Sequence, residues 1–241
     1  MKIAILTDGI TPYVNGGMQK HSFYLTKYLT IKNCDITLVH CTYDNNIPDD
    51  IEINKILFNN QSKLHKIITL KFPKSLKFPG HYLFNSFRYS RLVFEEIKND
   101  VNEFDFIYIK GFSGWKLLNK KKRGLISSNI GINFHGMNMF LPTKGFKLKL
   151  SNYLLKPFVR YNMRNSDFVF SYGGKVTSTI IKNGVLKSKI FEIPSGIESK
   201  YIISRTRLVQ NDKVKFLFVG RNDPLKGIDE IFKSLTLLDL N

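Results

Sequence analysis

Three loops of the sequence carry residues that suit anion binding or hydrogen bonding to a substrate. The first, TDGITPYVNGGMQ, contains Gly16 and Gly17, where the backbone can approach a phosphate closely. The second, NFHGMNMF, places His135 just after a strand-like run, where an imidazole can hydrogen-bond a substrate oxygen. The third, FVGRNDPLKGID, carries Arg221 and Lys226, whose guanidinium and ammonium groups can bind two phosphates together.

Each loop also has a structural interpretation. Paired glycines suit an ordinary turn at a helix start, lone histidines are most often structural, and basic side chains in a turn are often only solvated. The first loop lacks the G-x-G-x-x-G spacing of a dinucleotide-binding site. No D-x-D motif is present in the sequence, since Glu103-x-Asp105 and Asp50-x-Glu52 only come close to one. Taken one at a time, the loops therefore leave the chemistry open.

The segments around these loops alternate between β-rich runs and stretches with helical periodicity. This alternation predicts an α/β fold, a Rossmann-like parallel sheet with helices on both faces. In such a sheet, ligands gather where the carboxyl ends of strands meet the starts of helices. Strands are predicted at residues 2–7, 35–41, 104–110, 130–135, 167–173, 189–194 and 214–220, with an additional or edge strand at 51–58. Helices are predicted at 17–30, 85–99 and 146–165, where Pro157 is expected to kink or divide the helix, and from Gly174 to Gly184.

The length of 241 residues suits one large domain or two small ones. We predict a Rossmann-like domain at 1–198, a polar linker at 199–213, and the first strand and helix of an incomplete second domain at 214–241. Cys34 and Cys41 are too far apart along an extended strand for a disulfide and are predicted to be core residues in a reducing compartment. No apolar run reaches the length of a membrane span or forms a signal peptide, so a cytoplasmic location is expected.

The formal net charge of +18 is concentrated in two stretches without any acidic residue, 53–94 and 106–166. Such asymmetry favours an anionic partner, either nucleic acid, a membrane surface or a phosphorylated substrate, although a solvated lysine-rich surface is the plainer interpretation. We expect no nucleic-acid partner, because the sequence has no zinc-ligand spacing, RNP-like strand or helix-turn-helix pattern. The candidates for contact with a membrane or an acceptor are Lys71, Lys74, Lys77, Lys147, Lys149, Lys156 and Arg160, which are interleaved with aromatic residues or lie on a basic amphipathic segment.

The order of the three loops, with the segment IPSGIE between the second and the third, resembles the family 4 glycosyltransferases of the two-domain GT-B fold. In that family a Gly-Gly loop follows the first strand, a histidine closes a middle strand, and an IPNGVD-like segment precedes a VGR....KG motif. The resemblance covers nearly the whole chain. The departures are Gln19 in place of Glu, Ser195 in place of Asn and Glu198 in place of Asp.

The resemblance implies a role for each loop residue. Arg221 and Lys226 would bind the diphosphate of a nucleotide-sugar donor, Gly16 and Gly17 would approach the same phosphates, and His135 would contact the transferred sugar. The family implies transfer with retention to a glycan or lipid-linked acceptor in polysaccharide or glycolipid biosynthesis, with no metal and no other cofactor. The basic segments add peripheral binding at the inner face of the membrane as an option for the expected cytoplasmic location.

The family's second domain continues through further βα units that include an E-x7-E segment, and this chain ends before them. Three hypotheses follow. The chain is a truncated or split glycosyltransferase that needs a companion chain, or a catalytically inactive remnant that binds an acceptor, or, as a distant third, a nonspecific nucleic-acid binder.

Overall fold

The computed structural model describes residues 1–43, 47–58, 64–143, 145–198, 201–202, 216–220 and 226–237. The chain divides into two compact units, Met1–Ser195 and Gly196–Asn241. The predicted domain and linker boundaries at 198 and 213 stay a prediction.

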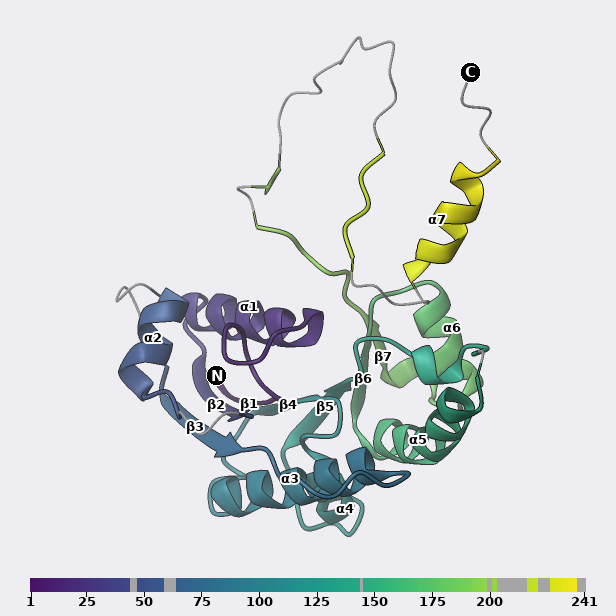
Figure 1. Cartoon of the computed structure of the whole chain (residues 1–241). Helices are drawn as coiled ribbons and strands as arrows, with labels where there is room; N and C mark the ends of the chain where they lie inside the picture. The colour runs from purple at the N-terminus through teal and green to yellow at the C-terminus, as the bar shows by residue number, and fades with distance from the viewer. Residues whose placement is uncertain are drawn as a thin grey trace. The chain divides into compact units, whose positions relative to one another are not determined.

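In the described residues of the first unit, seven strands form one parallel sheet in the order β3-β2-β1-β4-β5-β6-β7 (Figure 1). Each pair of neighbouring strands in this sheet is parallel, as the βα alternation predicted. The strands are β1 (Lys2–Leu6), β2 (Asp35–Thr42), β3 (Lys66–Lys71), β4 (Phe106–Lys110), β5 (Asn129–Asn133), β6 (Phe168–Ser171) and β7 (Ile190–Glu192). The fold is therefore α/β and Rossmann-like, which confirms the predicted fold class.

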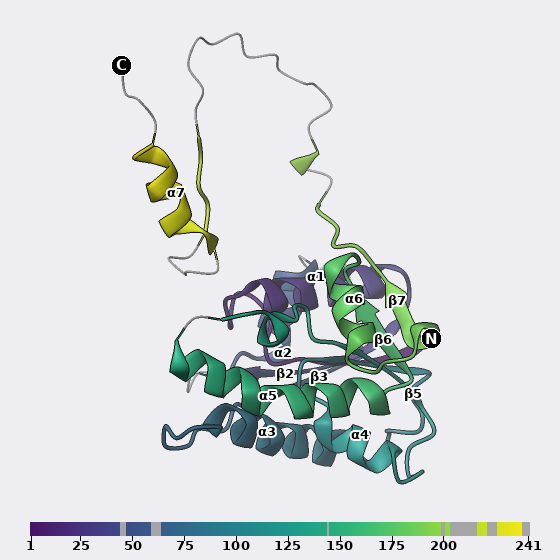
Figure 2. The ribbon, with the colours of Figure 1, turned by 90° about the vertical axis from the view of Figure 1, so that its right-hand side faces the viewer.

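Helices cover both faces of this sheet. The helices α1 (Gly17–Ile31) and α2 (Asp50–Phe58) lie on one face, and α3 (His81–Ile97) and α4 (Trp115–Lys121) lie on the other (Figure 1). On the side of α3 runs α5 (Phe146–Asn165), and α6 (Lys175–Lys182) follows β6 (Figure 2). Their short connections are the loops that carry the candidate residues.

Alternate residues of the central strands enter two separate cores, because side chains in a strand point to opposite faces in turn. Ile3 and Ile5 of β1 pack in the core that contains Phe23 of α1 and Ile53 of α2. Ala4 and Leu6 pack in the other core, with Val93 and Ile97 of α3. Strands that are buried on both faces have continuous apolar sequences, and this pattern explains why they could be predicted.

Two predicted strands are wrong. Residues 51–58 form the helix α2 instead of a strand, because the buried Ile53 and Leu57 are four residues apart and share one helical face. The helix predicted at 146–165 is confirmed as α5, and it is not divided at Pro157, which lies inside it. Among the described residues, 216–219 are not in a strand, and no neighbouring strand there supplies the hydrogen bonds that a strand needs. The sequence also did not predict the edge strand β3 or the short helix α4.

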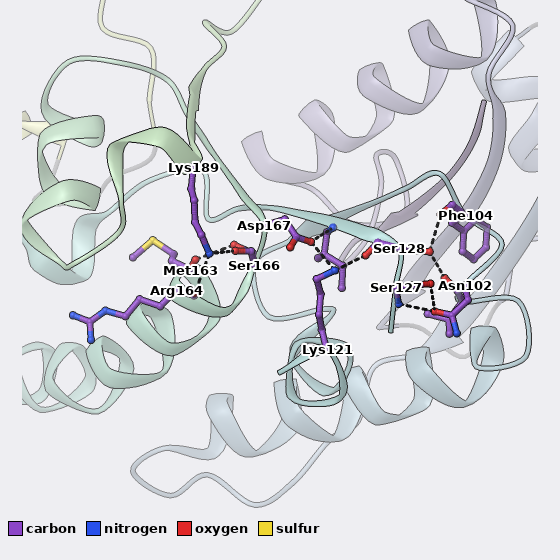
Figure 3. Close-up of polar contacts among 12 residues, drawn as sticks. Asn102, Phe104, Lys121, Ser127, Ser128, Met163, Arg164, Ser166, Asp167 and Lys189 are labelled. Atoms are coloured by element: carbon purple, nitrogen blue, oxygen red, sulfur yellow. Dashed lines mark hydrogen bonds and ion pairs between the residues drawn. The ribbon is translucent and has the colours of Figure 1, made fainter. Parts of the chain in front are cut away.

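At the amino ends of the strands, polar side chains form a network of hydrogen bonds and an ion pair (Figure 3). Lys121 Nζ lies 2.9 Å from Asp167 Oδ2 and donates a hydrogen bond of 2.7 Å to the Ser128 carbonyl. The Ile130 amide donates to the same Asp167 oxygen at 2.7 Å, which ties β5 to the start of β6. This network holds strands together, so we interpret the amino edge as structural.

In the second unit, the described part contains α7 (Ile228–Leu235). Asp229 and Glu230 stand in its first turn and Lys233 in its last, an arrangement that complements the helix dipole. Phe232 is exposed, and this helix buries no residue. The described part of the chain contains no helix long and apolar enough to cross a membrane.

Candidate functional site

The candidate site lies at the carboxyl edge of the sheet, where β1 and β4 are neighbours. The strand order turns there, since β2 and β3 follow on one side of β1 and β5 to β7 on the other side of β4. Loops that leave adjacent strands in opposite directions leave a crevice, which is where open α/β sheets bind ligands. The loops after β1, β4, β5 and β6 all reach this edge.

The paired glycines form the start of α1. Gly17 is the first residue of the helix and Gly16 its N-cap, with extended backbone and no hydrogen bond from a capping side chain. The side-chain oxygen of Gln19 occupies the place that a Cβ on Gly16 would take. A Cβ on Gly17 would lie 3.7 Å from His135 Nε2. The structure therefore brings Gly17 and His135 together from two different loops.

His135 is held in a constrained backbone conformation at the end of β5. Its φ of 63° lies in the left-handed region, which a residue with a side chain rarely adopts. The amide of His135 donates to Asn133 Oδ1 at 2.5 Å. Its Nδ1 lies 2.8 Å from the Tyr172 hydroxyl, and the two rings meet edge to face with centroids 4.9 Å apart. The ring is therefore oriented by Tyr172, from the loop after β6.

Lys110, the last residue of β4, lies at the centre of this group and is completely buried. Its Nζ is 3.3 Å from His21 Nδ1, 3.4 Å from His135 Nδ1 and 3.4 Å from the Tyr172 hydroxyl. None of the ion pairs of the described residues includes Lys110. Asp8 acts on it only through a longer-range Coulombic attraction. The ammonium thus faces neutral groups in place of a counterion.

Burial shifts the protonation of the whole group. It lowers the pKa of Lys110 to about 7, which the charge of Asp8 partly opposes. Burial, with a further contribution from the Lys110 charge, lowers the pKa of His21 and of His135 to about 4. Burial also raises the pKa of Asp8, which accepts a hydrogen bond of 3.2 Å from Gln19. At neutral pH both imidazoles are uncharged, so His135 is suited to hydrogen bonding and not to acid catalysis.

The two cations of the third loop are in the second unit. Lys226 is exposed, immediately before the N-cap Gly227 of α7. Arg221 lies outside the described residues. Binding of a diphosphate by both residues stays a prediction.

The predicted surface cations divide into two groups. Lys71, Lys74, Lys77, Lys147 and Lys149 are exposed, whereas Lys156 and Arg160 are partly buried. Arg160 has a structural explanation, because its Nε donates to Asn183 Oδ1 at 2.7 Å and its guanidinium lies 5.5 Å from the Phe140 ring centroid. Arg160 is therefore a packing residue in this fold.

Sequence reasoning did not identify Asp8, Lys110, His21 and Tyr172 as members of the site. The sequence contained a clue for two of these residues. His21 falls on the apolar face predicted for the first helix, and Lys110 closes an otherwise apolar strand. A polar or charged residue on a face that must be buried needs partners, and this requirement marks both positions.

Metal ligation has no candidate in the described part of the chain. There, no three side chains among histidine, cysteine and the acidic residues are placed to hold one ion. Cys34 and Cys41 are free cysteines, the first partly buried and the second buried.

No model of a known protein family matches the chain. An uncharacterized glycosyltransferase of Methanocaldococcus jannaschii is 26% identical over 249 residues, which cover 97% of this chain and 59% of that protein. Among solved structures, sucrose-phosphate synthase from Thermosynechococcus elongatus matches with a TM-score of 0.58 and 15% sequence identity, over 83% of this chain and 49% of that chain. The chain thus spans 59% of the first protein and about half of the second. The predicted resemblance to glycosyltransferases of the GT-B fold is confirmed, and the structural match bears on the fold alone.

Proposed function

We propose that this chain supplies the acceptor-side domain of a retaining glycosyltransferase that uses a nucleotide-sugar donor. The observation that carries the proposal is the meeting of Gly17 and a neutral His135 at the point where the strand order turns. This edge offers an anion-binding helix start and a hydrogen-bonding ring within one small volume. Sugar transfer from a nucleotide diphosphate needs both.

The start of α1 would receive the donor diphosphate. The first N–H groups of a helix have no intrahelical partner, and here the N-cap glycine supplies no side-chain cap and no acid stands in the first turn. A phosphate at such a position gains about 0.3–1 kcal/mol from the helix dipole, and more where it is partly buried. Arg221 and Lys226 would neutralise the same diphosphate as it departs, so that fixed cations and not a metal ion would stabilise the leaving group.

His135 would contact the transferred sugar. An imidazole with a pKa of about 4 is neutral at physiological pH, and it can hydrogen-bond a sugar hydroxyl without protonating it. This separates the role of His135 from that of a general acid. If the isolated chain is inactive, a companion chain would supply further βα units of a donor-binding domain.

The nucleotide part of the proposal is tested by titrating the chain with UDP-sugars and GDP-sugars while its backbone amides are followed by NMR. We expect the amides at the start of α1 and at His135 to shift. The variant Gly17→Ala adds a methyl group only 3.7 Å from His135 Nε2, an ordinary contact that preserves the fold but fills the approach to the helix start. It should weaken binding at least tenfold.

A matched control is Gly196→Ala, because nothing lies within 4 Å of the added methyl group. This variant should bind as the wild type does. Absence of any shift with both donor classes would favour an inactive acceptor-binding remnant, and equal binding by Gly17→Ala and the wild type would remove α1 from the site.

We further propose that the acceptor is lipid-linked and that a basic aromatic face docks on an anionic membrane. Leu76, Phe146 and Tyr153 are 87%, 82% and 73% exposed, and Lys74, Lys77, Lys147 and Lys149 are exposed in the same two segments. These segments are neighbours, because a Cβ on Gly80 would lie 3.9 Å from Leu154 of α5, and the starts of α3 and α5 lie on the same side of the unit (Figure 2). Such a face combines apolar anchors with charges worth about 1 kcal/mol each near an anionic leaflet.

Flotation with vesicles of phosphatidylglycerol and phosphatidylcholine tests this docking. We expect the wild type to float at low salt, and Lys74→Glu combined with Lys147→Glu to reduce the bound fraction severalfold. Failure of the wild type to float with anionic vesicles would remove the membrane from the proposal and leave the nucleotide part standing.

A further inference from the structure

All hydrogen bonds that the described residues make with the His135 ring reach the same ring nitrogen. Nδ1 lies 2.8 Å from the Tyr172 hydroxyl and 3.4 Å from Lys110 Nζ. Nε2 is on the other side of the ring, 3.7 Å from the position of a Cβ on Gly17. The ring therefore has one nitrogen in the protein interior and one toward the start of α1.

The direction of these hydrogen bonds follows from the donors available. A lysine ammonium can only donate, whereas a tyrosine hydroxyl can donate and accept. Lys110 Nζ lies 3.4 Å from the Tyr172 oxygen and 3.4 Å from His135 Nδ1, so Nδ1 faces an ammonium that can only donate and a hydroxyl that is free to donate. Nδ1 must then be an acceptor, and a neutral ring with an accepting Nδ1 carries its proton on Nε2.

We propose that Tyr172 and Lys110 are positioning residues that hold His135 as its Nε2–H tautomer, so that the ring presents a hydrogen-bond donor beside Gly17. The inference rests on the proposed function for the identity of the oxygen that accepts this bond. The N–H groups in the first turn of α1 are donors as well, and no acidic residue stands in that turn. The complementary ligand group is an oxygen with free lone pairs, which a phosphate or a sugar hydroxyl provides.

Lys110 also constrains the tautomer of a second histidine. Lys110 Nζ lies 3.3 Å from His21 Nδ1, so the ammonium also holds His21 with its proton on Nε2. The groups that face Lys110 are Asp8 from the loop after β1, His21 from α1, His135 from the loop after β5 and Tyr172 from the loop after β6. One buried cation thereby fixes two tautomers.

The test is an NMR measurement on the full chain labelled with ¹⁵N-histidine, in the absence of any donor. Long-range ¹H–¹⁵N spectra at pH 6 report which nitrogen of each ring carries the proton, and loss of a signal in His135→Gln assigns it. We expect His135 as Nε2–H in the wild type. In Tyr172→Phe, which keeps the ring and removes the hydroxyl, the Nδ1–H fraction of His135 should rise at least threefold.

Two further variants separate positioning from general disturbance. Tyr28→Phe removes an exposed hydroxyl elsewhere on α1 and should leave the His135 signals unchanged. Lys110→Met removes the ammonium, and the pKa of His135 should then rise from about 4, since part of its depression comes from that charge. An Nδ1–H tautomer in the wild type, or no change in Tyr172→Phe, would overturn the proposal.

The proposed tautomer of His135 and the proposed function can be contradicted independently of each other. An Nε2–H ring in a chain that binds no nucleotide-sugar would support the positioning of His135 and count against the donor. A shift of the His135 Nε2 signal when UDP-sugar or GDP-sugar is added would support both.

Discussion

Two lysines at opposite edges of the same sheet have contrasting surroundings. Lys121, near the amino ends of β5 and β6, has a carboxylate at 2.9 Å and a carbonyl at 2.7 Å. Lys110, at the carboxyl end of β4, has two imidazoles and a phenol at 3.3–3.4 Å, and none of the described ion pairs includes it. Lys121 is partly buried and ion-paired, whereas Lys110 is completely buried, where an uncompensated charge costs free energy. The two edges therefore accommodate a lysine in different ways, with an ion pair at the amino edge and with neutral groups at the carboxyl edge.

The largest effect is expected at the amino edge. Asp167→Ala removes the counterion of Lys121 and the acceptor of the Ile130 amide, so it should lower the free energy of unfolding by about 2 kcal/mol. Urea denaturation followed by circular dichroism measures this. Asp167→Asn keeps an acceptor for the amide and should cost about half as much. A loss below about 0.5 kcal/mol in Asp167→Ala would show that this edge is not held by its polar network.

Replacing Lys110 at the carboxyl edge should not destabilise the fold as replacing Asp167 does. Lys110→Met replaces a buried charge that lacks an ion-pair partner, so at pH 6 it should leave the free energy of unfolding unchanged or raise it by about 1 kcal/mol. The folded pKa of about 7 lies below the ordinary 10.5, so between these values the unfolded chain binds the proton that the folded chain has lost. Wild-type stability should therefore rise with pH across this window, and Lys110→Met should lack that rise.

Denaturation at pH 6 and pH 9.5 compares the two proteins directly. Strong destabilisation by Lys110→Met at pH 6 would mean that the contacts of Lys110 stabilise the fold as those of Lys121 do, and the contrast between the edges would disappear.

The smallest effect is expected at an exposed pair on the amino edge. Lys2 Nζ and Glu103 Oε2 are 3.4 Å apart, with side chains 54% and 65% exposed. Solvent screens such a pair, so Glu103→Gln should change the free energy of unfolding by less than about 0.5 kcal/mol. Equal losses in Glu103→Gln and Asp167→Ala would show that burial does not decide the importance of these ion pairs.

Sequence patterns predicted most of this fold and part of the site. The buried strands were identified because both of their faces are apolar, as Ile3 to Leu6 show. The segment 51–58 was predicted as a strand, because Ile51 and Ile53 alternate with polar residues, while the four-residue spacing of Ile53 and Leu57 decided the outcome. The edge strand β3 was not predicted, since a short run with lysines at both ends has a weak pattern.

The sequence by itself determined the alternation of strands and helices and the placement of Gly17 and His135 in loops at strand ends, because these depend on local periodicity and on turn residues. Only the tertiary structure decided that Lys110 meets His21, His135 and Tyr172, which are 89, 25 and 62 residues away in the chain. The physical reason is the strand order, which places β1, β4, β5 and β6 side by side so that the loops after them meet at one edge. Lys110 closes an apolar strand and Lys121 lies in a basic run, but only the fold shows that Lys121 pairs with Asp167 at the amino edge while Lys110 joins the candidate site at the carboxyl edge.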